Sequence, residues 1–537
     1  MKKNLLLLIT ILTVFSCSKE KVDLIVINSN TYTVNTSFDQ AEAFAIKDGV
    51  FVAVGKNEEI TGRYQSDKIV NAENKTIVPG LIDAHCHFYR MGLQQQKVSL
   101  EGTKSYDEVL EKLVAFQKEK NTNFITGRGW DQNDWELKEF PTKEKLDALF
   151  PKIPVAIGRV DGHALLVNQV AINMAGITKN TKVSGGEIIL KNGKLTGVLI
   201  DAAMDFINFP ETSNKEAIQG LLDAQKIAFS YGLTTVDDAG LDRNTIELID
   251  SLQKAKSLKM RIYAMVSADK QKQINYYINK GKLKTKRLNV RSFKVYGDGA
   301  LGSRGATMRT SYSDRDNHFG ALIYTPERYQ EIAKQIAASD YQMNTHAIGD
   351  SANTWMLKTY KEVLKDSKNR RWRIEHAQII SEEDFNHFDN ILPSVQPTHA
   401  TSDMYWAGDR VGTKRMKGAY AFKKLLNTYG KIALGTDFPV EQVNPFLTFY
   451  AATIRKDTNN YPKDGFQMEN ALTREETLKG MTIWAAYSNF EEDEKGSIEV
   501  GKFADFVILN QDIMNVEGRD IPKTNAISTY LNGEKVY

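Results

Sequence analysis

The sequence predicts an α/β fold: a (β/α)8 TIM barrel, a sheet domain formed from both chain ends, and a large insertion after barrel strand 1. Three observations lead to this prediction. The chain has 537 residues, more than one typical domain. Its middle part alternates short apolar runs with helical stretches, and both of its ends contain strand-like segments with tight turns.

The first residues have the pattern of an export signal. A basic start precedes the apolar run Leu5 to Phe15, which is too short to be a convincing transmembrane span. Val14-Phe15-Ser16-Cys17 resembles a bacterial lipobox, in which the Cys is lipidated after cleavage. We therefore expect residues 1–16 to be a lipoprotein signal peptide and Cys17 to be the lipidation site. An ordinary secretory signal with an incidental Cys is the alternative.

This signal predicts an exported protein that is lipid-anchored in the bacterial cell envelope. Ser18 rather than Asp follows Cys17, which resembles the enterobacterial signal for the outer membrane and leaves the periplasmic or surface side open. The lipid anchor is the only membrane contact that we expect. If Cys17 carries lipid, Cys86 is the only other cysteine, and no internal disulfide can form.

The charge balance excludes a strongly basic or acidic partner. Removing residues 1–16 takes away two lysines, so 68 of the 70 basic residues remain against 67 acidic ones. We therefore expect no binding to nucleic acid. The composition does not indicate an oligomeric state.

The chain ends alternate like antiparallel sheet. Strand-like runs at the N-terminal end cover residues 24–27, 43–46 and 50–55, and those at the C-terminal end cover residues 505–509, 527–531 and 534–537. Lys47-Asp48-Gly49 and Asn532-Gly533 supply turns. We expect residues 17–78 and 496–537 to be two half-modules that complete one sheet domain.

The barrel is expected over residues 79–495, because this region contains eight apolar runs that have the features of buried strands. They are Gly80 to His85, Thr234 to Ala239, Arg261 to Val266, Phe293 to Asp298, Gln342 to Ala347, Arg373 to Gln378, Pro393 to Thr398 and Ile432 to Asp437. Helical stretches such as Lys215 to Tyr231 and Ala352 to Lys365 fall between several of them.

Two further strand-like runs, Phe124 to Gly129 and Pro154 to Arg159, belong in this interpretation to an insertion at about residues 100–231. It also contains a predicted hairpin, Gly186 to Leu199, with an Asn192-Gly193 turn. So long an insertion between strands one and two predicts a lid or a pocket wall.

Polar residues stand at the expected carboxyl ends of the barrel strands, where active sites of this fold lie. Strand one ends in His85 and His87, whose spacing puts both imidazoles on one side of a strand. The other polar residues are Lys294 in strand four, His346 at the end of strand five, His376 at the end of strand six and Asp437 at the end of strand eight. Any one histidine alone is more often a hydrogen-bonded core residue, but the set predicts a metal site.

With these residues, the chain resembles the metal-dependent amidohydrolase superfamily, which joins a (β/α)8 TIM barrel to a β-sandwich made from both chain ends. The resemblance implies that residues 17–78 and 496–537 are the two halves of this β-sandwich domain. The motifs that carry the resemblance are Val78-Pro79-Gly80-Leu81-Ile82-Asp83-Ala84-His85-Cys86-His87, Thr345-His346-Ala347-Ile348-Gly349-Asp350, Ile374-Glu375-His376-Ala377, Gly435-Thr436-Asp437 and Gly501-Lys502-Phe503-Ala504-Asp505. The segments Lys294 to Arg304 and Arg159 to His163 are similar to the amidohydrolase-3 branch, which includes N-substituted formamide deformylases.

The resemblance implies two divalent metal ions, with Zn²⁺ favoured and Mn²⁺, Fe²⁺ or Co²⁺ left open. His85, His87 and Asp437 would hold the first ion. His346 and His376 would hold the second, with Lys294 bridging both as a CO₂-derived carbamate (a carboxylated lysine). An unmodified Lys294, beside a single ion or pointing outward, is the alternative.

Three softer candidates for substrate binding remain. His163 in the insertion and His399 after strand seven would touch the substrate or hold a structural hydrogen bond. Arg304 would clamp a carboxylate or pin a loop. Cys86 lies between two expected ligands but faces away from them, so we expect it only to pack.

The expected function is hydrolysis of a non-peptide C–N bond in a small amide or N-acyl compound. Hydroxide on the metal would attack the carbonyl, and Asp437 would act as general base and then general acid. Two alternatives stay open: a metal-dependent lactone or phosphoester hydrolase, and a catalytically silent ligand-binding lipoprotein.

Overall fold

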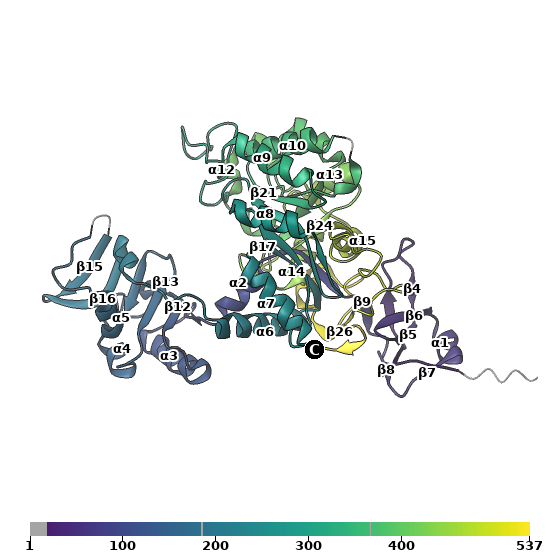
Figure 1. Cartoon of the computed structure of the whole chain (residues 1–537), viewed down its shortest axis with the longest axis horizontal. Coiled ribbons are helices and arrows are strands. Elements are labelled where there is room, and N and C mark those ends of the chain that lie inside the picture. The colour runs from purple at the N-terminus through teal and green to yellow at the C-terminus, as the bar shows by residue number, and fades with distance from the viewer. Residues whose placement is uncertain (1–18, 184–185, 366) are drawn as a thin grey trace, which may run out of the picture. The chain divides into compact units, whose positions relative to one another are not determined.

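The computed structural model describes residues 19–183, 186–365 and 367–537. The expected signal peptide and the expected lipidation site, Cys17, lie outside these residues. The chain divides into two compact units (Figure 1): unit 1 comprises the chain up to Cys86 with residues 228–243 and 260–537, and unit 2 comprises residues 87–227 and 244–259.

Unit 1 contains a nearly closed barrel of eight parallel strands, which confirms the predicted fold class. In barrel order the strands are β10 (Leu81–Cys86), β17 (Leu233–Leu241), β18 (Arg261–Ser267), β20 (Leu288–Tyr296), β21 (Gln342–Ala347), β22 (Arg373–His376), β23 (Leu392–Val395) and β24 (Ala433–Leu434). Nearly every side chain on these strands is buried, as parallel strands covered on both faces require. The short strand β19 (Leu283–Lys284) adds an antiparallel pairing beside β20.

The last barrel strand joins the first through a turn rather than through a regular ladder. The Asp437 N–H donates to the His85 carbonyl at 2.8 Å. The Asp83 carboxylate accepts from the Thr436 N–H at 3.0 Å and from the Thr436 hydroxyl at 2.7 Å. A Cβ at Gly435 would lie 2.5 Å from the His85 nitrogen, so only glycine permits this approach.

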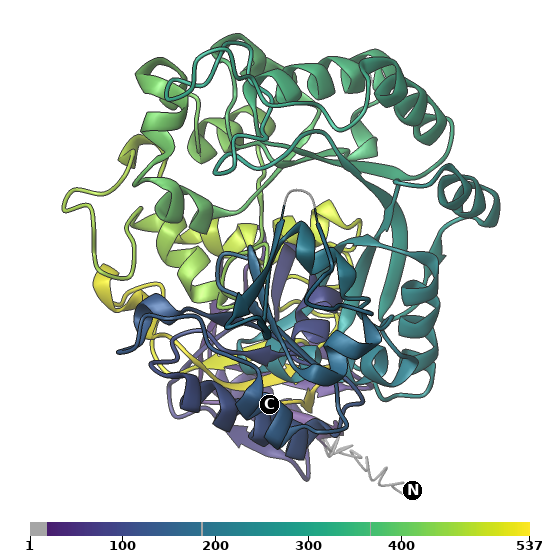
Figure 2. The same cartoon turned by 90° about the vertical axis from the view of Figure 1, so that its left-hand side faces the viewer.

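Helices cover the outside of the strands in unit 1 (Figure 2). These include α8 (Gln271–Lys280), α9 (Pro326–Ala337), α10 (Asp350–Leu364) and α13 (Phe422–Tyr429). The remaining helices of unit 1 are α1 (Asn57–Arg63), α11 (Pro397–Asp403), α12 (Ala407–Met416), α14 (Pro445–Thr453), α15 (Arg474–Gly480) and α16 (Ile483–Ser488). The start of α9 is fixed locally, because Thr325 caps the Arg328 N–H and Pro326 occupies the first turn.

The β-sandwich has one sheet from the N-terminal end and one sheet from both ends. The four-stranded sheet has the order β6 (Val50–Gly55), β5 (Ala43–Lys47), β2 (Leu24–Ile27) and β8 (Ile69–Asn71). The six-stranded sheet has the order β27 (Glu534–Lys535), β26 (Ala526–Leu531), β25 (Phe506–Leu509), β9 (Thr76–Pro79), β3 (Asn30–Tyr32) and β4 (Gln40–Ala41). The two sheets share a hydrophobic core, in which the ring centroids of Phe44 and Phe506 lie 5.0 Å apart. A further pair, β1 (Glu20–Lys21) and β7 (Tyr64–Gln65), is parallel.

The expected insertion forms a six-stranded sheet within unit 2. Its order is β11 (Val98–Ser99), β12 (Ile125–Trp130), β13 (Val155–Arg159), β14 (Ala164–Val167), β16 (Lys194–Asp201) and β15 (Gly186–Lys191). Unit 2 contains the whole of α2 (Phe88–Gln94), α3 (Tyr106–Lys120), α4 (Glu144–Leu149) and α5 (Gln169–Met174). It also contains α6 (Asn214–Ser230) as far as Ile227 and α7 (Arg243–Lys254) from Asn244 onward. The two strand-like runs and the hairpin assigned to the insertion are therefore present, and Trp130 packs in its core.

Only strand five ends at the predicted residue; strand six, for example, ends at His376 rather than at Gln378. Three of the other differences change where site residues lie. Strand four begins at Leu288 and ends at Tyr296, so Asp298 lies in the following turn. Strand seven stops at Val395, because Pro397 suits the first turn of a helix and begins α11, which carries His399. Strand eight is only Ala433–Leu434, since the chain turns after it to bond with β10. Within the part of the chain that the structure describes, no helix has the length and apolarity needed to span a membrane.

Candidate metal centre

Five of the predicted site residues meet within the barrel of unit 1. Lys294 Nζ on β20 lies 3.2 Å from His85 Nε2 on β10, and Asp437 Oδ1 lies 3.7 Å from the same nitrogen. The imidazole of His376, at the end of β22, is 4.9 Å from that of His85 and 4.5 Å from that of His346 on β21, measured between ring centroids. Residues that are distant in sequence thus form one compact cluster.

Two groups within this region have the spacing of metal ligands. The ligand atoms of His85, His87 and Asp437 all lie within 4.8 Å of one another, and so do those of His376, His399 and Asp437. His87 directly follows β10, where it precedes the first turn of α2. The second group contains His399, where we expected His346.

The carboxylate of Glu375 holds the first histidine in place, a role that the sequence did not reveal. Its Oε2 lies 2.6 Å from His85 Nδ1, and both side chains are fully buried. Nδ1 therefore donates to Glu375, and Nε2 faces Lys294 and Asp437. Metal-ligating histidines are usually oriented in this way by a carboxylate on the other ring nitrogen.

Burial sets the charge state of the cluster. It lowers the pKa of His346 to about 3 and that of His376 well below its usual value, and nearby Lys294 adds to the effect at His346. Burial also lowers the pKa of Lys294 to about 8, although Glu375 and Asp437 act in the opposite direction. His346 and His376 are therefore neutral near pH 7, which is the form that binds a metal ion. Burial opposes protonation of His399, but Asp437 and Glu441 raise its pKa to about 10.

The cluster fits a divalent cation. Among the described residues, His346 Nε2 and His376 Nδ1 are buried nitrogens with no hydrogen-bond partner. A buried polar atom without a partner is costly, and a metal ion would satisfy both lone pairs. Neutral imidazole and carboxylate are the ligand types that Zn²⁺ prefers.

The backbone is strained where two of these side chains project. His376 has φ +70° and Asp437 has φ +64°, and both are non-glycine residues in the left-handed region. Such strain persists only where the surroundings impose it, and it is concentrated at functional sites. Here the left-handed turns direct the two side chains into the cluster.

A buried carboxylate, Asp298, ties two loops together beside His346. Its Oδ1 accepts from the Ile348 N–H at 3.0 Å, and its Oδ2 accepts from the N–H groups of Thr307 at 2.8 Å and Gly349 at 2.9 Å. Oδ1 is 3.6 Å from His346 Nε2. Burial raises the pKa of Asp298 to about 7 despite these hydrogen bonds. Asp298 thus joins the loops that follow β20 and β21.

The candidates for substrate contact have different environments. His399 Nε2 lies 3.3 Å from Asp437 Oδ2, so His399 is part of the cluster. Arg304 makes a two-point ion pair with Asp314 at 3.1 and 2.8 Å, as a residue that pins a loop would. His163 belongs to unit 2, is largely exposed, and pairs with Asp201 at 2.8 Å. The Cys86 thiol, which we expected only to pack, is buried.

Comparison with known proteins places this architecture in a family. A model of the amidohydrolase family, Amidohydro_3, matches residues 68–537. This chain belongs to the amidohydrolase family. Its members are metal-dependent hydrolases, and the cluster described above occupies the position where a (β/α)8 barrel carries its active site.

Relatives of this amidohydrolase span nearly its whole length. The protein LONG AFTER FAR-RED 3 of Arabidopsis thaliana is 32% identical over 96% of this chain and 91% of its own. The N-substituted formamide deformylase of Arthrobacter pascens is 23% identical over 95% of this chain and 97% of its own. A solved metal-dependent hydrolase from Pyrococcus furiosus has the same fold, with a TM-score of 0.76, 24% identity and coverage of 92% of this chain and 100% of its own.

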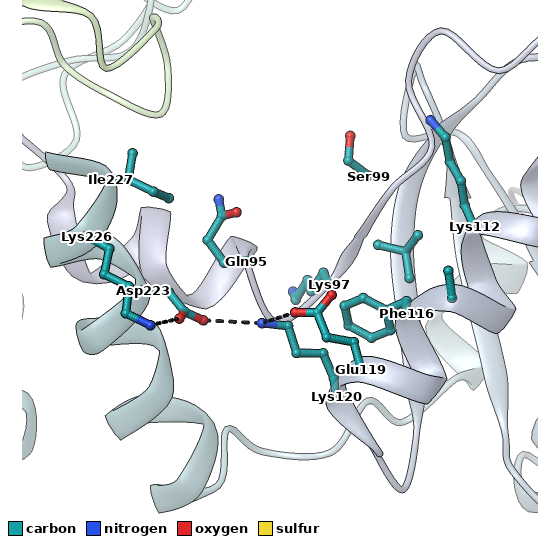
Figure 3. Close-up of a pocket in the computed structure, with 12 residues that line it drawn as sticks. Gln95, Lys97, Ser99, Lys112, Phe116, Glu119, Lys120, Asp223, Lys226 and Ile227 are labelled. Carbon is teal, nitrogen blue, oxygen red and sulfur yellow. Dashed lines mark hydrogen bonds and ion pairs between the residues drawn. The ribbon is translucent and has the colours of Figure 1, made fainter. Parts of the chain in front are cut away.

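Unit 2 of the amidohydrolase contains a separate hollow of about 520 Å³ between α3, β11 and α6 (Figure 3). Asp223 at its edge pairs with Lys120 at 3.3 Å and with Lys226 at 4.0 Å, and Lys120 pairs with Glu119 at 3.2 Å. The described residues that line this hollow include neither His nor Cys. Four lysines and two acidic residues line it, so the ion pairs leave an excess of positive charge.

Proposed function

We propose that this amidohydrolase cleaves a non-peptide C–N bond in a small amide or N-acyl compound. The observation that carries the proposal is the buried cluster of His85, Lys294, His346, His376 and Asp437 in the barrel. The formamide deformylase supports the C–N assignment, because that relative acts on an N-substituted formamide and aligns over nearly the whole chain.

Two metal ions would be held by the imidazoles of His85, His87, His346 and His376 and by the carboxylate of Asp437. A bound Zn²⁺ supplies a Lewis acid that polarises a carbonyl and lowers the pKa of water. Glu375 keeps the His85 ring in the orientation that presents Nε2 to the cluster. The imidazoles of His346 and His376 are neutral and add no positive charge beside a bound cation.

Asp437 has the position of a proton carrier. Its two oxygens face different partners, with Oδ1 near His85 and Oδ2 near His399. We infer that it accepts a proton from the attacking water and delivers this proton to the leaving amine, as general base and then general acid. Its strained backbone fixes the carboxylate for both steps.

Lys294 is suited to carboxylation by CO₂. Burial favours its uncharged amine, which is the form that adds to CO₂ to give a carbamate and a proton. The product places a negative charge beside His85, where an ammonium would repel a dication. We propose that the carbamate completes the ligand set of two metal ions.

A substrate-class panel tests this function. The zinc-loaded protein is assayed with N-formyl and N-acyl amines, lactones and phosphotriesters, beside a double variant in which His85 and His87 are both replaced by alanine. Turnover confined to the amides and lost with the zinc in the double variant supports the proposal. Turnover of lactones or phosphotriesters alone would show that the enzyme cleaves another type of bond. Full turnover by the metal-free double variant would contradict the proposed metal-dependent function.

We also propose that the protein is exported and anchored by lipid at Cys17. The support is the lipobox-like sequence Val14-Phe15-Ser16-Cys17 after a short apolar run. Metabolic labelling with a radioactive fatty acid should mark the wild type and leave Cys17→Ser unlabelled. Equal labelling of both proteins would refute the anchor.

A further inference from the structure

His399 is held between two carboxylates. It lies on α11, and its Nε2 is 3.3 Å from Asp437 Oδ2, whereas its Nδ1 is 3.0 Å from Glu441 Oε1. The Ser402 hydroxyl, one helical turn after His399, donates to the same Glu441 oxygen at 2.7 Å. Glu441 therefore fixes the orientation of the imidazole.

The same construction occurs at His85. There Glu375 lies 2.6 Å from Nδ1 and leaves Nε2 facing Asp437. His399 likewise directs Nδ1 to a glutamate and Nε2 to Asp437. A carboxylate on the far ring nitrogen is the usual support of a metal-ligating histidine, because it fixes the tautomer and makes the ligand nitrogen more basic.

His376 supplies the neighbouring ligand atom. Its ring centroid lies 5.8 Å from that of His399, and the ligand atoms of His376, His399 and Asp437 all lie within 4.8 Å of one another. Among the described residues, the buried His376 Nδ1 has no hydrogen-bond partner. Two imidazoles and a carboxylate at this spacing could hold a zinc ion and would leave room for a further ligand.

We propose that His399 is a metal ligand together with His376 and Asp437, and that Glu441 is the positioning residue that orients it. The inference rests on the proposed function, because both need a metal ion in the barrel. In this proposal the metal centre has one ligand from α11, the helix that follows barrel strand β23. A histidine that only contacted substrate would affect the Michaelis constant and leave metal affinity unchanged.

Zinc affinity of the intact purified chain distinguishes these roles. Wild type, His399→Ala and Glu441→Gln are titrated with zinc against a chromophoric chelator, and bound zinc per chain is counted by mass spectrometry. His387→Ala is the matched control, because that histidine also lies near a carboxylate, with His387 Nε2 3.9 Å from Asp384 Oδ1. Thermal unfolding of each apoprotein shows whether the fold is retained.

We expect Glu441→Gln to weaken the binding of one zinc ion about 10- to 100-fold, and His399→Ala to weaken it at least as much. The control should bind zinc as the wild type does. Replacing zinc with Co²⁺ should give visible absorption that changes in both variants, which a purely structural effect would not cause. Because Glu441→Gln conserves size and shape, it tests the inference even if His399→Ala does not fold.

Wild-type affinity and an unchanged Co²⁺ spectrum in Glu441→Gln and in folded His399→Ala would overturn the inference and leave the proposed function intact. A wild-type chain that binds none of Zn²⁺, Mn²⁺, Fe²⁺ and Co²⁺ would overturn both the inference and the proposed function. The two failures are therefore distinguishable within one experiment.

Discussion

Replacing Glu375 with glutamine should weaken metal binding without unfolding the protein. In the wild type, the Glu375 carboxylate lies 2.6 Å from His85 Nδ1, and both groups are fully buried. The glutamine side chain would keep the size of the original and a carbonyl that accepts from Nδ1, but it would lack the negative charge that raises the basicity of Nε2.

The size of the effect follows from this geometry. Removing a supporting carboxylate costs about 10- to 100-fold in metal affinity, which corresponds to about 1.4–2.8 kcal/mol. Glu375→Ala should cost more, because it removes the acceptor altogether and leaves a buried N–H without a partner. Zinc affinity should therefore be highest in the wild type, lower in the glutamine variant and lowest in the alanine variant.

Competition titration with a chromophoric chelator measures these affinities. Glu382→Gln is the matched control, because its side chain is 76% exposed and pairs with Lys424 at the surface. Thermal unfolding of the apoproteins should show the glutamine variant folded. Zinc affinity of a folded Glu375→Gln within twofold of the wild type would refute the reasoning that a charged partner at Nδ1 tunes the metal centre.

Three further outcomes are expected. Removing metal with a chelator should abolish turnover, and added zinc should restore it; activity that survives complete metal removal would argue against metal-dependent hydrolysis. Arg261→Met should lower the free energy of unfolding by about 3 kcal/mol, because it removes the 2.6 Å ion pair between Arg261 and Asp505 and leaves the buried Asp505 carboxylate without its cation. A variant with the denaturant midpoint of the wild type would contradict this loss of stability. Glu491→Gln should lower the thermal unfolding midpoint at neutral pH. Burial opposes ionisation of Glu491, but Lys495 and Lys284 lower its pKa to about 2, below the ordinary 4.5. This stabilisation is present above pH 4.5 and is lost as the pH falls toward 2, so the difference in midpoint between wild type and variant should narrow on acidification. If the difference in thermal unfolding midpoint between wild type and Glu491→Gln stays constant from about pH 7 to about pH 3, the stabilising role of ionised Glu491 is refuted.

The barrel could be predicted from the sequence because its strands are short, apolar and buried. Each of the eight predicted runs overlaps an observed strand. The boundaries failed where local chemistry overrides apolarity. Pro397 begins a helix, and the turn from Gly435 to Asp437 bonds to β10 instead of continuing strand eight. These features depend on neighbours that are distant in sequence.

The site could be predicted only in part, because the residues that orient its histidines, Glu375 and Glu441, do not stand at a regular sequence distance from them. Glu375 precedes His376, and strict alternation in a strand would direct the two side chains to opposite faces. The left-handed backbone of His376 ends that alternation, so both side chains reach the cluster. Glu441 lies 42 residues after His399 and is brought to it by the fold alone.

The central claim is that a metal ion is bound by the barrel cluster. Anomalous X-ray scattering at the zinc absorption edge, from crystals of the zinc-loaded protein, tests it most directly. We predict anomalous density in contact with the imidazoles of His85 and His376 and the carboxylate of Asp437. Zinc bound only outside this cluster, or no anomalous density in it at saturating zinc, would contradict the claim.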